Sequence, residues 1–236
     1  MKTSVLFPVI AAVSICLAAG CKKGEDGVSA SNKIGVSAKD LAQQTLIISP
    51  IHNPYEVQIG LLGASDYSNK KSIEEPLTHW TIQGVTVTTR NLVKFDLSGV
   101  PSTAKIISAH LCLSSDTIPQ NGDLIHANFG PDNSFFVQQV ATQWDPATIT
   151  WFNQPDGLAA NEVLVPSTTL PFLNVHIDVT NIVNVMLSNN SNYGFKLMLK
   201  QESPYPPNDY VSRIFCSSYY DTDLSRRPKL VIIYQP

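Results

Sequence analysis

The 236-residue sequence predicts an all-β protein, a single β-sandwich of antiparallel strands with one short helix. Three observations lead to this prediction. Apolar residues make up 43% of the chain and charged residues 15%, which is sufficient for one sizeable core. Val, Ile, Thr and aromatic residues fill short segments in which apolar and polar positions alternate. Sixteen prolines and many Ser, Thr and Asn residues separate these segments, as expected of a chain with numerous turns.

The first twenty residues are predicted to be a signal peptide rather than part of the fold. Lys2 precedes an apolar stretch that is too short and wrongly flanked for a membrane-spanning helix. The stretch ends in LAAGC, which resembles a bacterial lipobox and implies cleavage before Cys21 and lipidation of its thiol. An ordinary secretory signal followed by a chance cysteine is the alternative. We therefore expect a protein anchored by its lipid to the bacterial outer membrane and exposed at the cell surface.

Three segments follow from this reading of the chain. Residues 1–20 are the lipoprotein signal peptide, and residues 21–44 are the lipidated cysteine with a polar, flexible tether. Residues 45–236 form one folded domain, because no linker, low-complexity run or internal repeat interrupts them. We expect this domain to be a monomer.

Alternating apolar residues mark most of the strands. We expect strands at residues 45–49, 84–98, 105–115, 134–144, 148–152, 174–180, 195–200, 211–218 and 228–234, and a loop-rich segment at 53–76. The inward positions of the second and third strands are Val93, Phe95, Leu97, Ile107, Ala109, Leu111 and Leu113. A helix follows residue 180, with Thr180 as its N-cap and an apolar stripe at Ile182, Val183, Val185 and Met186.

Two of the three tryptophans flank a turn in the segment TQWDPATITWF. Pro146 and Asp145 favour the turn itself. Ile149 and Trp151 share a strand face, so we expect Trp151 to lie in the core and Trp144 to be mostly buried at the same corner. Neither is then a platform for a sugar ring.

Four blocks in order resemble the signature of the DNRLRE domain, which is similar to carbohydrate-binding module family ninety-six. They are RNLVKFDLSGVPSTAKIISAHLCL, QQVATQWDPATITWFNQP, HIDVTNIVNVMLSNNSNYGFKLML and RIFCSSYYDTDLSRRPKLVIIY. The resemblance implies a jelly-roll β-sandwich that binds polysaccharide, acidic in some members. It also implies structural roles, as turn, cap or ion-pair residues, for Asp96, Asp178 and Arg227, and a structural role for the tryptophan corner.

Two cysteines remain in the domain, in a compartment that permits disulfides. Cys112 and Cys216 either form a bridge or stay as two separate thiols, and the sequence leaves both alternatives open. There is no CxxC motif and no Cys/His cluster, so we expect neither a metal nor a cofactor.

No pattern of an enzyme active site is present. The chain lacks the GxSxG, HExxH, P-loop and GxGxxG motifs, and its five histidines are scattered. Glu74 and Glu75 are adjacent, so in a strand they would point to opposite faces, and we interpret them as solvated loop charges. A net charge of −3 argues against nucleic acid as a partner.

Binding of a polysaccharide, possibly anionic, is the function that the sequence favours. Exposed aromatic rings and planar polar groups recognise sugars, and basic groups recognise acidic ones. The candidate residues are Tyr67, Lys70, Lys71, Trp80, Arg90, Tyr205, Tyr210, Arg213, Tyr219 and Tyr220. Each could instead pack a loop or be a solvated charge. A structural or adhesive envelope protein is the alternative function, and a polysaccharide-degrading enzyme is the third.

Overall fold

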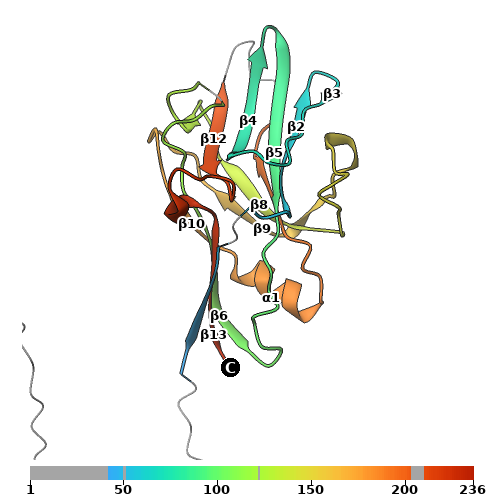
Figure 1. The fold of residues 1–236 in the computed structure, drawn as a ribbon, viewed down its shortest axis with the longest axis vertical. Helices are drawn as coiled ribbons and strands as arrows, with labels where there is room; N and C mark the ends of the chain where they lie inside the picture. Colours follow the sequence, from blue (N-terminus) through green and yellow to red (C-terminus); the bar gives the residue numbers. More distant parts are fainter. Residues whose placement is uncertain (1–41, 50–51, 122, 203–209) are drawn as a thin grey trace, which may run out of the picture. The chain divides into compact units, whose positions relative to one another are not determined.

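The computed structural model describes residues 42–49, 52–121, 123–202 and 210–236. The predicted signal peptide, Cys21 and Tyr205 lie outside these ranges. Within them the protein is mostly β-structure, arranged in two antiparallel sheets with one α-helix, which confirms the predicted fold class (Figure 1). No helix of this part of the chain is long and apolar enough to cross a membrane.

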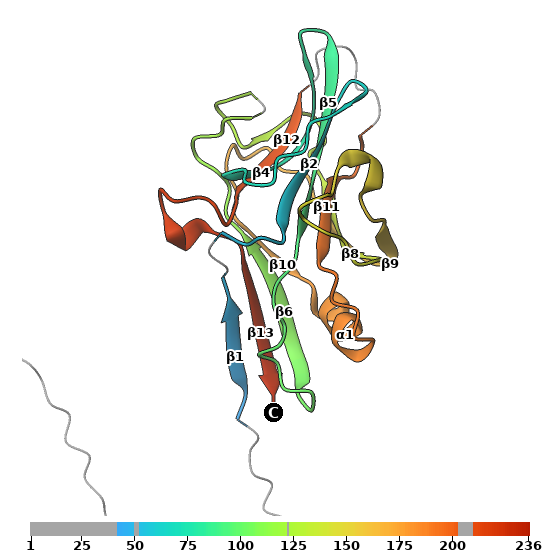
Figure 2. The same ribbon diagram turned by 45° about the vertical axis from the view of Figure 1, so that its right-hand side comes forward.

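The smaller sheet contains four strands. Their order is β1 (Gln44–Ile48), β13 (Lys229–Gln235), β6 (Lys105–Leu113) and β10 (Val175–Asp178), and each neighbouring pair is antiparallel. The first and the last strand of the described residues therefore pair with each other in this sheet, as β1 beside β13 (Figure 2).

The larger sheet contains nine strands of the described residues. The main path runs β7 (Asn128–Phe129), β12 (Val211–Cys216), β4 (Glu74–Ile82), β5 (Val85–Val93), β11 (Phe195–Leu199), β8 (Phe135–Val140) and β9 (Gly157–Val165). Strand β2 (Glu56–Leu62) pairs with β5, and the short β3 (Ser65–Asp66) pairs with β2.

The main core lies between the two sheets and is closed by the helix α1 (Thr180–Ser188). Val93, Phe95 and Leu97 are buried there, as predicted, and so are Ala109, Leu111 and Leu113. Ile107 is the exception, with 39% of its surface exposed. It lies near the start of β6, toward the end of the smaller sheet that extends beyond the larger one in Figure 2.

A second, smaller core lies on the opposite face of β2 and β5. It consists of Val57, Ile59, Leu92, Val140, Trp144 and Ile149, with Trp151 and Tyr193 packed against it. The segment after β8 that carries Trp144 and Trp151 covers these strands. The tryptophan corner therefore covers one face of the larger sheet rather than filling the space between the sheets.

The strand predicted at residues 148–152 is absent. The segment forms a turn and then a short 3-10 helix, η1 (Trp151–Asn153). Asp145 causes the turn, because its carbonyl accepts the amides of Thr148 and Ile149 at 3.2 and 3.0 Å and its carboxylate accepts that of Ala147. Backbone groups satisfied locally in this way do not join a sheet ladder.

The helix begins where the sequence predicts it, but its cap differs. Val179 is the N-cap residue, and Thr180 is the first residue of the helix. The Asp178 carboxylate accepts the amide and the hydroxyl of Thr180 at 2.9 and 2.6 Å. The Thr180 hydroxyl also accepts the amide of Ala109 on β6 at 2.9 Å. Thr180 therefore ties the helix to the smaller sheet instead of capping the helix.

The two cysteines are both free. Cys112 is half-buried on β6 of the smaller sheet, and Cys216 is fully buried on β12 of the larger sheet. In the structure each thiol has its own surroundings: the Cys112 Sγ lies 3.7 Å from the Nδ1 of His176, and the Cys216 Sγ lies 3.9 Å from the carbonyl oxygen of Ser115.

Candidate functional site

A hollow of about 700 Å³ lies beside the start of β4, and we call it the loop groove. One wall comes from β2, β3 and the loop that leads into β4, and another from the loop that follows β6. The lining residues are Gln58, Asp66, Tyr67, Ser68, Asn69, Lys71, Ser72, Ile73, Glu74, Gln120 and Asn121. Most of them are polar, and Tyr67 is the aromatic residue among them.

The loop that carries Tyr67 folds back onto β2. The amide of Tyr67 donates to the carbonyl of Gly60 at 2.7 Å, and Gln58 and Asn69 exchange two backbone hydrogen bonds at 3.1 and 2.9 Å. A Cβ at Gly60 would lie 2.6 Å from the Tyr67 carbonyl oxygen, so the close approach requires glycine. The phenol ring of Tyr67 is held at the surface, 44% exposed.

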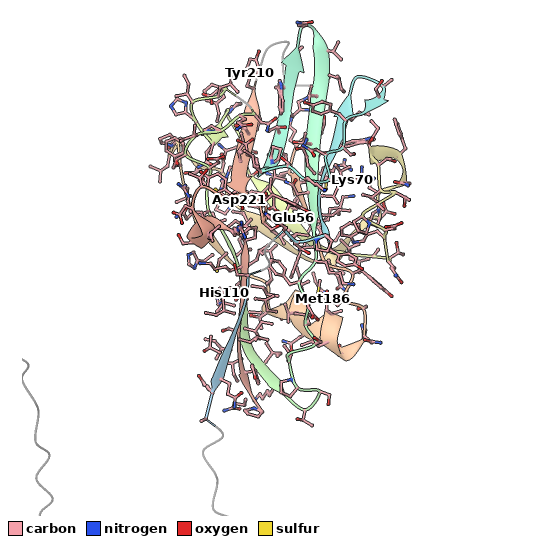
Figure 3. The ribbon with its side chains drawn as sticks, in the orientation of Figure 1. Glu56, Lys70, His110, Met186, Tyr210 and Asp221 are labelled. Atoms are coloured by element: carbon pink, nitrogen blue, oxygen red, sulfur yellow. The ribbon has the colours of Figure 1, made fainter. Side chains whose placement is uncertain are left out.

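The same loop is fastened to the tryptophan corner. The Asp66 carboxylate accepts the amide of Trp151 and the hydroxyl of Ser68, both at 2.7 Å. The Lys70 ammonium donates to the carbonyl of Ala147, and Figure 3 shows Lys70 on this side of the larger sheet. The corner therefore supports one edge of the groove. The Lys70 ammonium is already engaged in its hydrogen bond to the corner.

Glu74 forms the floor of the groove, and its carboxylate holds the second wall. It accepts the amide of Gln120 and the side-chain amide of Asn121, each at 2.5 Å. Burial, aided by the nearby Asp116, raises the pKa of Glu74 to about 7 against the hydrogen bonds from Gln120 and Asn121 that lower it. The prediction of a solvated charge was wrong, because Glu74 is only 1% exposed at the start of a strand that the sequence pattern did not reveal.

Glu75 is also buried rather than solvated. It lies beside Glu56, whose carboxylate accepts the amide of Ser218 at 2.9 and 3.0 Å. Burial and the Glu56 charge together hold the pKa of Glu75 well above its usual range. The pair is enclosed by the fold, and we assign it no part in the groove.

The lining of the groove suits hydroxyl-rich ligands. Polar side chains of the kind that orient sugar hydroxyls line the groove. They are the planar amides of Gln58, Asn69 and Gln120 and the ammonium of Lys71. The exposed ring of Tyr67 offers a flat apolar surface to the C–H face of a sugar. Among the described residues, no group of three or more His, Cys, Asp or Glu side chains could hold a metal ion.

Two of the predicted sugar-binding aromatics are buried. Trp80 lies in β4 opposite Val87 and is 6% exposed, so it presents no free ring face. Tyr220 is likewise 6% exposed, and its hydroxyl points to Asp116 at 3.5 Å. Both residues were expected at the surface because the strand β4 and the packing of the chain after β12 were not evident from the sequence.

The other predicted aromatics do not converge on the groove. Tyr219 is half-buried and stacks on the ring of His52, with 5.1 Å between the ring centroids. Tyr210 is half-buried directly before β12 and does not line the groove. Tyr205 lies outside the described residues.

The two arginines among the predicted basic partners are engaged within the protein. Arg90 donates from Nε to both carboxylate oxygens of Glu202, at 2.9 and 3.0 Å, and its guanidinium lies 4.3 Å from the ring centroid of Trp151. Arg213 is fully buried, 5.1 Å from the ring centroid of Phe135. Neither guanidinium is available to an acidic ligand.

Most of the residues interpreted as structural lie in turns, ion pairs or packed positions. Trp144 is 8% exposed, and its Nε1 donates to the carbonyl of Tyr193 at 2.8 Å. Asp96 accepts the amide of Ser98 in a turn, and the nearly buried Arg227 pairs with Asp221. Trp151 differs from its prediction. It is only partly buried, because it opens η1 instead of a strand.

Sequence reasoning singled out Tyr67 and Lys71 but missed the groove around them. Gln58 and Glu74 belong to strands hidden in a segment interpreted as loop-rich, and Gln120 and Asn121 come from a distant loop. The run DYSNKK, in which an aromatic residue is followed by an amide and two cations, is the local signal that could have pointed to the site.

One comparison with known proteins bears on this geometry. The model of the family named carbohydrate-binding module family 96 matches residues 67–206 of the chain. All the lining residues of the loop groove except Gln58 and Asp66 lie within that match. A search of curated proteins found no match to the chain.

Proposed function

The chain belongs to carbohydrate-binding module family 96, and we propose on that premise that it is a non-catalytic cell-surface protein that binds polysaccharide in the loop groove. The observation that carries this proposal is the exposed ring of Tyr67 within a hollow lined by amide groups. Such a combination supplies stacking for sugar rings and hydrogen bonds for their hydroxyls.

The anchoring of the protein forms part of the same proposal. Lipidation at Cys21 would hold the domain at the outer membrane, where a polysaccharide-binding surface meets extracellular polymer. Replacing Cys21 with serine should abolish labelling by a palmitate analogue and release the protein from membranes. Retention of both would contradict the lipid anchor without affecting the groove.

A binding experiment tests the groove directly. We expect Tyr67→Ala to weaken binding in affinity electrophoresis against a panel of soluble polysaccharides by roughly five- to tenfold, the value of one lost stacking contact. Phe172→Ala is the matched control, because Phe172 is similarly exposed at 37% and does not line the groove. Equal binding by both variants and the wild type would exclude the loop groove as the site.

The absence of catalysis is tested on the same material. Incubation of the protein with the polysaccharide that it binds should release no new reducing ends. Turnover that is lost in Glu74→Gln would instead identify an enzyme, because Glu74 is the ionisable group at the floor of the groove.

An adhesive role is the second candidate, and one observation favours it. Ile118, Leu124 and Ile125 expose 74%, 62% and 67% of their surfaces in the segment between β6 and β7. Exposed aliphatic side chains that form one patch are typical of a protein contact surface, and these three come from a single segment. Binding to envelope proteins that is abolished by Ile125→Asp, together with no polysaccharide binding, would support this function.

A further inference from the structure

A lysine and a tyrosine meet at the surface beyond the paired ends of β2 and β5. Glu56 and Val93 are the last pair of the ladder, and Tyr55 and Lys94 are the residues next to them. The Lys94 amide donates to the Tyr55 carbonyl at 2.9 Å, and the Lys94 ammonium lies 5.1 Å from the centroid of the Tyr55 ring. Neither residue lines the loop groove.

The backbone beneath this pair is fixed by a buried amide. Asn53 is 5% exposed; its Oδ1 accepts the amide of Tyr55 at 3.0 Å, and its Nδ2 donates to the carbonyl of Lys94 at 2.9 Å. The Tyr55 ring packs against Trp144 in a T-shaped arrangement, with the ring planes at 84° and the centroids 6.1 Å apart. The pair is therefore pre-organised, which lowers the entropy cost of binding a ligand.

Two hollows flank the pair, and both are lined by Tyr55 and Lys94. The smaller, of about 180 Å³, lies toward the tryptophan corner and includes Gln143. The larger, of about 690 Å³, lies toward α1, where Figure 3 labels Met186. It combines apolar side chains with amides, among them Phe95, Leu97, Met186, Leu187, Asn190 and Asn192. Between the hollows the Tyr55 ring is 42% exposed.

The Lys94 ammonium belongs to none of the ion pairs of the described residues, in contrast to the guanidinium groups of Arg90 and Arg227. Asp96 and Asp145 border the hollows, but both carboxylates accept hydrogen bonds in their own turns. Lys94 is thus a half-buried cation on an aromatic ring, outside the ion pairs of the described residues. Its charge adds to the hydrogen bonds from Ser98 in lowering the pKa of the Asp96 carboxyl.

We propose that the two hollows around Tyr55 and Lys94 form a second binding site, which takes an anionic residue of a polysaccharide. The sugar ring stacks on the exposed face of Tyr55, and its carboxylate or sulfate group pairs with the Lys94 ammonium. The site is separate from the loop groove and goes beyond the proposed function. Asn53 and Tyr55 also precede residue 67, where the family match begins.

Matched pairs of polymers test the requirement for charge. Polygalacturonate is compared with its fully methyl-esterified form, and dextran sulfate with dextran, by affinity electrophoresis and by calorimetry. We expect the protein to bind the acidic member of at least one pair more tightly, and the pair that responds distinguishes carboxylate from sulfate. Equal binding of acidic and neutral members in both pairs would overturn the proposal.

Matched variants test the location. Lys94→Gln keeps most of the stem of the side chain and should weaken binding to the acidic polymer about tenfold, with a smaller dependence on salt. Lys105→Gln removes the same charge from an exposed strand end and should leave binding unchanged. Unchanged binding by Lys94→Gln would overturn the proposal, as would an equal loss in Lys105→Gln.

Two further variants separate this site from the loop groove and from misfolding. Tyr55→Phe keeps the ring and should bind normally, whereas Tyr55→Leu should lose affinity, with the melting temperature of each variant measured alongside. If Tyr67→Ala abolishes binding to every polymer and Lys94→Gln affects none, the loop groove remains and the second site is excluded. The reverse pattern excludes the loop groove and supports the second site.

Discussion

Replacing Trp144 with alanine should cost the protein more stability than replacing Trp151. Trp144 is 8% exposed, packs in the second core and donates a hydrogen bond from Nε1 to Tyr193. Truncating such a residue costs about 3–5 kcal/mol. Trp151 is only partly buried, and its specific contact is with the Arg90 guanidinium. A cation–π contact and partial burial together contribute about 1–2 kcal/mol.

Urea unfolding followed by far-UV circular dichroism measures this difference. A gap of about 2 kcal/mol between the two variants corresponds to about 1 M in urea midpoint, for a slope of about 2 kcal/mol per molar. Trp144→Phe keeps a ring but loses the hydrogen bond, and it should fall between the wild type and Trp144→Ala. A Trp151→Ala midpoint equal to or below that of Trp144→Ala would refute the assignment of Trp144 to the second core.

Three further outcomes are expected. Because the pKa of Glu74 is raised from 4.5 to about 7 in the folded protein, stability should fall as the pH rises through that window, by up to about 3 kcal/mol. Glu74→Gln should remove this part of the slope in pH-dependent urea unfolding, and an identical slope in both proteins would contradict the assignment. Dithiothreitol should leave the melting temperature unchanged, since Cys112 and Cys216 are free, and a lowered melting temperature would indicate a bridge. Thr180→Val should destabilise the protein by about 1–2 kcal/mol because the amide of Ala109 loses its acceptor, whereas Thr180→Ser should be close to neutral and a cost shared by both would point to packing instead.

Local patterns in the sequence were sufficient for much of the fold. Alternation placed Val93 and Leu111 in the core because a strand with one buried face must have an apolar residue at every second position. The helix over residues 180–188 followed from its apolar stripe in the same way. Strands β2 and β4 escaped prediction because polar residues such as Gln58 and Glu75 are themselves buried, which removes the alternation.

The candidate sites depended on tertiary structure for a different reason. Glu74 and Gln120 are 46 residues apart in sequence, and a hydrogen bond between them exists only once β4 and the loop after β6 are packed together. Exposure is decided in the same way, so Trp80 is covered while Tyr67 remains open. The sequence alone determined the strand-rich class, the helix and the family signature, because these rest on periodicity and short-range preference. Only the folded chain decided which polar groups are buried, which cations are paired and which aromatic rings face solvent, because each of these depends on neighbours brought from far along the chain.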